Sequence, residues 1–416
     1  MKTLQTLLLC ASLCALAPSA FADSRAEIAE LKAAMQDMLN RIEALESENA
    51  ALRSSDNKAE HHSAQDIPIK TKPAAAWSER VALKGDLRYR YEGFDIDGRD
   101  DRSRSRIRAR LQANAALTDS LSMTIGVATG SNDPVSANQT LGSGGSSKNI
   151  NLDLAYFAWA FAEDWKLMGG KYKNVWLKPS GSQLIWDDDY NPEGFALTWA
   201  GDRWFMNSAY QWLESDSGSD NELALYGIQG GIQTGALDGM VTVGAGHYRM
   251  ATEGHEVFFG DADEFGGNSF TCANFATLDQ CEYDQDYDLT QLFARWSGSV
   301  GDLPLSFFAE YVNNADAKDF DTAWAAGASI GKVSHWNTWQ FDYRYQDLEE
   351  DAVFALLTNS NFGGGGTGSE GHIFQGRFGI NKAWQLRLTY FMNEQNVIGG
   401  SNTDYDRIQL DSRFKF

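Results

Sequence analysis

The sequence predicts an all-β protein, a transmembrane antiparallel β-barrel of about 16 strands that follows a short α-helical coiled coil. A strand-like alternation, a secretory signal and the lack of a long apolar run after that signal support this fold. The alternation is clearest in residues 405–416, where apolar residues occupy one parity and most polar residues the other. A repeat of two is typical of a β-strand. In an exported chain it indicates a barrel with lipid outside and water inside.

Residues 1–22 have the features of a secretory signal peptide. Lys2 precedes an apolar stretch from Leu4 to Leu16, and residues 20–22 (Ala-Phe-Ala) form a small-x-small cleavage site. The apolar stretch is too short to span a bilayer. We therefore expect export, cleavage after residue 22 and location in a bacterial outer membrane.

The chain is strongly acidic, and this limits its partners. It carries 57 acidic and 35 basic residues, a formal net charge of −22, which argues against nucleic acid as a partner. Many acids cluster between predicted strands, as at 187–189 and 349–351. Two interpretations stay open: these acids keep loops soluble, or they bind cations among lipopolysaccharide head groups. Outer-membrane lipid and lipopolysaccharide are the expected surroundings.

Residues 23–54 are expected to form a periplasmic coiled coil. Apolar residues alternate steps of three and four, as the a and d positions of heptads do, over roughly 37 Å of helix. The expected core positions are Ile28, Leu31, Met35, Met38, Ile42, Leu45, Asn49 and Leu52. Complementary flanking charges favour parallel self-association, and we expect a homotrimer. A dimer, which the polar a position favours, and a monomeric amphipathic helix are the alternatives.

Residues 55–78 are polar, contain proline and are expected to be a linker. Adjacent His61 and His62 lie in this segment, and we interpret them as solvated side chains, so no metal site is expected. Residues 79–416 then alternate short turns with long loops, as outer-membrane barrels do. We count 16 strands, and an even number places both barrel ends on the periplasmic side; a missed or added hairpin would give 14 or 18.

One face of the first two predicted strands is basic. Arginine on the lipid face is most costly near the bilayer midplane, so we expect this face to line the lumen. There it requires counter-charges or water. The residues are Lys84, Arg88, Arg90, Arg102, Arg104, Arg106, Arg108 and Arg110.

Two cysteines remain after the signal peptide, Cys272 and Cys281. Both fall in one long loop that we expect to lie outside the membrane. Exported chains pass through an oxidising periplasm. The sequence therefore predicts a disulfide between them.

The mature chain as a whole resembles the Gram-negative outer-membrane family of putative porins, which combine a periplasmic coiled coil with a 16-stranded barrel. The similarity includes residues 83–91 and the alternating arginines of 102–110, and it continues through 152–157, 170–174 and 186–194. Phe414 and Phe416 resemble the closing signal that the barrel-assembly machinery reads. Ser412 departs from the pattern, because an apolar residue is usual there.

The resemblance also implies a role for the loop at 174–192. By its position after the fifth strand it resembles the loop that folds into the lumen of porins and narrows it. The acids that would then oppose the basic face are Asp187, Asp188, Asp189 and Glu193. In the alternative these acids stay outside, and the arginines pair with lumen acids such as Asp153, Glu310 and Asp342.

The family resemblance implies a water-filled channel for passive diffusion of small hydrophilic solutes and ions. An anion- or phosphate-selective channel is the first alternative, because guanidinium groups bind phosphate through a bidentate fork. A structural protein that tethers the envelope is an alternative of a different class. No histidine occupies a recognisable catalytic motif, so we expect neither an enzyme nor a cofactor.

Overall fold

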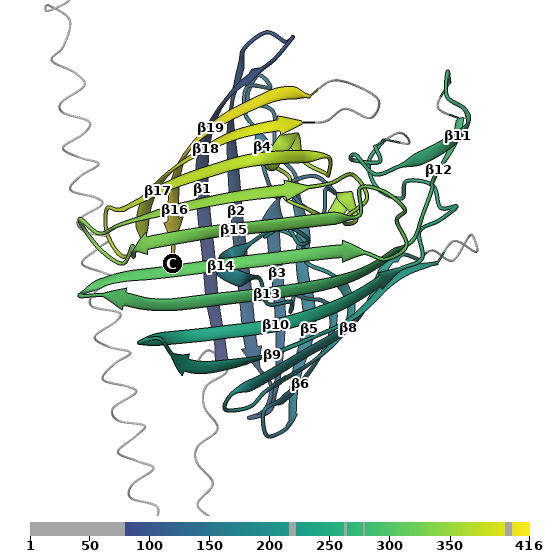
Figure 1. The fold of residues 1–416 in the computed structure, drawn as a ribbon. Coiled ribbons are helices and arrows are strands. Elements are labelled where there is room, and N and C mark those ends of the chain that lie inside the picture. The colour runs from purple at the N-terminus through teal and green to yellow at the C-terminus, as the bar shows by residue number, and fades with distance from the viewer. Residues whose placement is uncertain (1–79, 216–221, 262–263, 278, 396–401) are drawn as a thin grey trace, which may run out of the picture. The chain divides into compact units, whose positions relative to one another are not determined.

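The computed structural model describes residues 80–215, 222–261, 264–277, 279–395 and 402–416 (Figure 1). The signal peptide, coiled coil and linker expected within residues 1–78 lie outside this part of the chain. Over the described ranges, no helix is long and apolar enough to cross a membrane.

Sixteen strands of the described chain form a closed antiparallel barrel, as predicted. Each strand pairs with the next one around the barrel, and the first pairs with the last. The strands are β1 (Val81–Ile96), β2 (Arg102–Ala116), β3 (Leu121–Thr129), β5 (Ile150–Ala162), β6 (Trp165–Lys171), β7 (Glu193–Ala200), β8 (Trp204–Glu214), β9 (Leu223–Ala236), β10 (Gly239–Met250), β13 (Tyr287–Val300), β14 (Leu303–Asn314), β15 (Thr322–Gly331), β16 (Trp339–Leu348), β17 (Ser369–Gly379), β18 (Trp384–Gln395) and β19 (Thr403–Lys415).

The connections alternate in length around the barrel. Short turns such as 237–238 and 301–302 define one end, and long loops such as 130–149, 172–192, 251–286 and 349–368 define the other. The long loops carry the remaining elements. These are the two-residue strand β4 (Gln139–Thr140), the hairpin β11 (Phe270–Asn274) and β12 (Asp279–Tyr283), and the 3-10 turns η2 (Pro179–Gly181), η3 (Ala355–Leu357) and η4 (Phe362–Gly364).

Side chains of β1 show how the wall separates lipid from lumen. Successive residues of a strand point to opposite faces. Tyr89 and Tyr91 are 45% and 44% exposed on the outer face, whereas Arg88 and Arg90 are buried inside the barrel. The outer face is therefore apolar and aromatic, as contact with lipid requires.

The 251–286 and 349–368 loops pack on each other at the long-loop end. Phe354 of the second loop contacts Tyr283 and Tyr287, with ring centroids 5.3 and 5.4 Å apart. Asn268 donates to the carbonyl oxygens of Glu350 and Val353 at 2.7 and 2.9 Å. These contacts make the two loops one packed unit.

The predicted disulfide is present in the first of these loops. Cys272 and Cys281 are register partners in the β11–β12 hairpin and are bonded. Both cysteines are buried. The bond closes the hairpin on itself, and it makes no covalent link to the barrel wall.

Replacing both cysteines by serine should loosen the hairpin and leave the barrel intact. A disulfide contributes about 2–4 kcal/mol, mainly by restricting the unfolded chain, and this one restricts only a short segment. Limited proteolysis should cut the variant faster near residues 270–283, while its heat-modifiable migration stays that of the parent. Equal cleavage of parent and variant would show that the bond does not hold the hairpin.

Candidate functional site

The basic faces of β1 and β2 lie side by side on the inner wall. Their register places Arg88 opposite Arg108 and Arg90 opposite Arg106. Arg88, Arg90, Arg108 and Arg110 border an internal cavity of about 520 Å³. Strand register therefore gathers charges from both strands into one surface.

Acids of β1 and β19 neutralise part of this surface. Asp411 of β19 accepts two hydrogen bonds from Arg90, at 2.6 and 2.9 Å. Glu92 pairs with Arg104 at 2.5 Å and with Arg407 at 2.7 Å. Removing one partner of a buried pair typically costs about 3–5 kcal/mol. The sequence analysis missed these pairs, although Glu92 and Asp411 lie on the inward parity of their strands.

Asp86 of β1 completes the pairing at the other end of the ladder. It binds Arg110 at 2.7 Å and Arg108 at 3.1 Å. Arg106 has a different partner, the backbone oxygen of Asn138 at 3.4 Å. The guanidinium group of Arg102 lies over the ring of Phe94 at 4.7 Å. Of the eight predicted basic residues, Lys84 lies nearest the short turns, where it borders a second cavity described below.

The three aspartates of the 172–192 loop each have different partners. Asp189 accepts from Arg108 at 2.8 Å and from Arg110 at 3.2 Å. Asp188 pairs with Lys178 of the same loop. Asp187 accepts from the backbone N–H groups of Asp189 and of Ser360, at 2.7 and 3.1 Å. Only one of the three aspartates therefore contacts the basic wall, and it contacts that wall directly.

The other predicted acids lie apart from that contact. Glu193 begins β7 and pairs with Lys171 at 3.0 Å. Asp342 pairs with Arg377 at 2.7 Å. Asp153 accepts from the amide of Asn191, and Glu310 accepts from that of Gln291. None of these four acids makes an ion pair with the β1–β2 arginines in the described chain.

Aromatic packing holds the 172–192 loop against the wall at β9 and β10. Trp176 and Trp186 both contact Tyr248, with centroids 4.9 and 5.2 Å away. The backbone of Leu177 exchanges two hydrogen bonds with the Gln229 amide, at 2.7 and 3.0 Å. Since Asp189 of the same loop binds arginines of β2, the loop extends from one side of the lumen to another. The inward course was expected from the loop's position after the fifth strand; Trp176 and Trp186, apolar residues in a predicted loop, are a further sequence signal that was not used.

Two glycines allow this loop to leave the wall. Gly170 of β6 and Gly194 of β7 are register partners at its base, with φ of 115° and 145°. A Cβ at either position would lie 2.2 or 2.1 Å from a backbone oxygen of the neighbouring strand. Larger residues would therefore disturb both the backbone and the strand pairing here.

The 349–368 loop is a second inward loop, which the sequence analysis did not predict. Residues 351–359 are all buried. Its Asn361 side chain accepts from Arg90 at 3.3 Å and from Gln409 at 3.0 Å. The N–H of Asp187 donates to the carbonyl oxygen of Leu357 at 2.8 Å. The two inward loops thus contact each other and the same basic wall.

A further basic group borders the cavity from β16 to β19. Arg344 donates to the carbonyl oxygen of Gly181 in the first inward loop at 3.0 Å. Nine basic side chains border the whole cavity: Arg88, Arg90, Arg108, Arg110, Lys173, Arg344, Arg377, Arg387 and Arg413. Four acidic ones do so: Asp187, Asp188, Asp189 and Asp342. The cavity lining therefore has a formal excess of positive charge.

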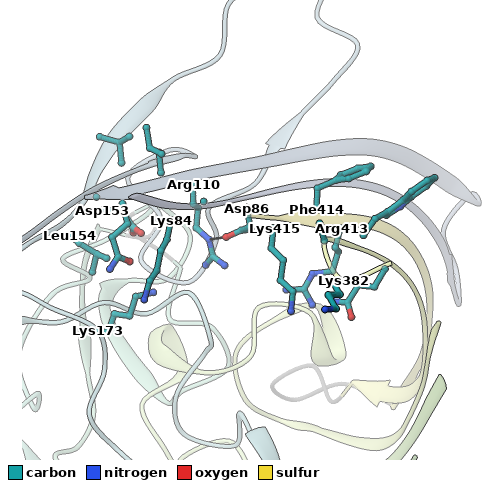
Figure 2. A pocket seen from close by; sticks show the side chains of 18 of the residues that line it. Lys84, Asp86, Arg110, Asp153, Leu154, Lys173, Lys382, Arg413, Phe414 and Lys415 are labelled. Carbon is teal, nitrogen blue, oxygen red and sulfur yellow. Dashed lines mark hydrogen bonds and ion pairs between the residues drawn. The ribbon is translucent and has the colours of Figure 1, made fainter. Parts of the chain in front are cut away.

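Figure 2 shows the second cavity, at the short-turn end of the lumen. It encloses about 300 Å³ and includes the turn residues Val333 and Ser334. Arg110, Lys173 and Arg413 border both cavities, so the two spaces adjoin. The basic residues here are Lys84, Arg110, Lys173, Lys382, Arg413 and Lys415, and the acidic ones are Asp86 and Asp153.

The pKa values of Asp187 and Asp189 in the 172–192 loop are shifted in opposite directions. Burial raises the pKa of Asp187, and the carboxylate of Asp189 raises it further. Burial also acts on Asp189, but Arg108 and Arg110 outweigh it and hold the pKa of this carboxyl below its ordinary value. Asp189 is therefore ionised at neutral pH and supplies full negative charge at the wall.

Comparisons with known proteins place these features in a family. The family described as "Putative porin" matches residues 95–230 and 280–416, which is more than half of the chain. A search among curated proteins finds no match.

Several solved structures have a similar course of the chain. OprB of Pseudomonas putida shares 13% identity over 82% of this chain and 95% of its own, with a TM-score of 0.54. OmpT of Vibrio cholerae shares 14% over 81% and 99%, with a TM-score of 0.46. A triple mutant of the Rhodopseudomonas blastica porin shares 10% over 81% and 100%, with a TM-score of 0.47. The likeness to OprB shows a shared fold, and the family match shows that the chain belongs to the putative porin family.

Proposed function

We propose that this porin passes small hydrophilic solutes and ions by passive diffusion across the bacterial outer membrane. Its path would run through the lumen between the basic wall of β1 and β2 and the two inward loops. The observation that carries the proposal is the 520 Å³ cavity bordered by charged side chains from both the wall and the loops. Charged rings in a narrow, wet passage bias which ions enter.

The basic wall and Asp189 should have opposite effects on ion selectivity. Replacing Arg104, Arg106 and Arg108 by Gln should favour cations, and Asp189→Asn should favour anions. One unit charge at 4 Å changes the free energy of an ion by about 1 kcal/mol even in bulk water, which corresponds to roughly a fivefold change in permeability ratio. The measurement is the reversal potential in planar bilayers across a KCl gradient.

Asp188→Asn is the matched control for Asp189→Asn. It removes the same charge from the same loop, but the Asp188 side chain is 62% exposed and pairs with Lys178, so solvent screens it more. We expect a smaller shift from it. If the arginine triple variant and Asp189→Asn both keep the parental reversal potential, these residues do not bound the permeation path.

An anion-selective channel is the second candidate. The nine basic against four acidic side chains around the cavity favour it, and both cavities share this excess. Loss of phosphate conductance in the arginine triple variant, with KCl conductance retained, would support this specialisation.

A structural protein that tethers the envelope is an alternative to the channel, of a different functional class. We propose that the coiled coil expected at residues 23–54 lies in the periplasm. Lipid and lipopolysaccharide would surround the wall, and the barrel-assembly machinery would insert it. A pure tether would show no conductance steps in a planar bilayer.

We also propose a homotrimer, with the coiled coil as a parallel clamp. The heptad pattern and its complementary charges support this assembly. Light scattering of the mature protein in mild detergent should give three copies. Ile42→Lys should lower the dissociation temperature, because it places a charge in the expected helical seam, whereas an exposed change such as Lys84→Gln should not. A monomer at all concentrations would refute the trimer.

A further inference from the structure

Four arginines that border the 520 Å³ cavity lack a carboxylate partner in the described part of the chain: Arg88 of β1, Arg344 of β16, Arg387 of β18 and Arg413 of β19. Arg344 donates to the carbonyl oxygen of Gly181 instead, whereas the other three lie on adjacent strands. Other arginines around this cavity, such as Arg90, Arg108 and Arg377, pair with aspartates. The three thus form a distinct group on adjacent strands.

The register brings these three positions together. Arg88 lies directly opposite Arg413. Arg387 lies opposite Asp411, two residues along β19. Like charges opposite each other on a sheet are destabilising. Asp411 makes its two hydrogen bonds to Arg90, and within the described residues it forms no ion pair with Arg88, Arg387 or Arg413.

Burial increases the cost of leaving these groups unpaired. Arg88 is only 6% exposed, and its guanidinium group donates to the amide oxygen of Asn138. Among the residues that the structure describes, the buried Nε atoms of Arg88 and Arg387 have no hydrogen-bond partner. An unsatisfied buried donor is expensive, and more so when it is charged. The group therefore has donors available for an anion.

Building on the proposed channel function, we propose that Arg88, Arg387 and Arg413 form a binding site for a compact dianionic oxyanion, such as phosphate or a phosphate monoester. Guanidinium forks bind tetrahedral oxyanions through paired hydrogen bonds. Adjacent strands lie about 4.8 Å apart, so the three guanidinium groups can surround one compact oxyanion. A dicarboxylate, whose two charges are farther apart, would fit the same space less well. A monovalent anion would leave much of the charge unneutralised.

The short-turn cavity provides a route to this site. Arg413 borders both cavities, and Figure 2 shows its side chain beside those of Lys382 and Lys415. These two lysines have no carboxylate within ion-pair distance in the described chain. They would raise the local concentration of anions at the entrance. An oxyanion would then pass from the lysines to Arg413 and on to Arg387 and the buried Arg88.

The test is block of single-channel chloride current by inorganic phosphate in planar bilayers. Parental channels should show concentration-dependent block, and Arg88→Gln, Arg387→Gln and Arg413→Gln should each raise the half-blocking concentration by about tenfold or more. Arg387→Lys keeps the charge but not the fork. It should retain the chloride preference and still weaken block, which a purely electrostatic role would not predict.

Arg295→Gln is the matched control. Arg295 of β13 also has a buried Nε atom without a protein partner, but it does not border the cavity. Its replacement should leave phosphate block unchanged. Heat-modifiable migration of each variant should confirm that the barrel has folded.

Comparison of blockers identifies the ligand chemistry. Phosphate and sulfate should block more strongly than succinate, and glycerol phosphate shows whether a monoester also fits. Stronger block by succinate would refute a site for a compact dianion. The site would be refuted, with the channel left intact, if phosphate blocked Arg88→Gln, Arg387→Gln and Arg413→Gln as strongly as the parent. Parental chloride current that is insensitive to phosphate would refute it as well. Absence of any conductance would instead refute the proposed channel function.

Discussion

Water is not available inside a bilayer to hydrogen-bond an open strand edge, so a sheet that spans it has to pair its first strand with its last. Here β1 and β19 pair from Asp86 to Ile96 on the first strand. Closure gives every strand an inner and an outer face. The alternation of side chains then decides which charges line the lumen. The arginine wall is thus a consequence of closure combined with a period of two.

The loops divide the enclosed space unequally. Tryptophans of the 172–192 loop pack toward Tyr248 of β10, on a part of the wall that offers small and aromatic side chains. The 349–368 loop fills space from the opposite direction and reaches β1 and β19 through Asn361. What stays open is the region beside the arginines, where desolvating unpaired charges would be costly. Apolar packing therefore positions the polar passage.

The sequence predicted the barrel well because strand alternation is a local property. Sixteen strands were expected and sixteen close the barrel, and the cysteine pair was expected from its compartment. The partners of the charged side chains were harder to predict, because ion pairs join residues far apart in the chain. Arg90 and Asp411 are 321 residues apart, and the sequence around one does not indicate the other. Only the structure explains Ser412, the departure from the usual apolar residue, because its hydroxyl accepts a hydrogen bond from the indole N–H of Trp384.

Total charge and local charge are independent in this molecule. The chain carries a net charge of −22, yet basic side chains outnumber acidic ones around both cavities. Fields in a narrow lumen depend on the nearest groups, because solvent and salt screen distant ones within about 10 Å. Many acids of the loops are exposed and therefore act weakly on the lumen. We therefore expect the selectivity of the proposed channel to depend on the few basic side chains of β1, β2 and β16–β19, together with Asp189, which pairs with Arg108 and Arg110.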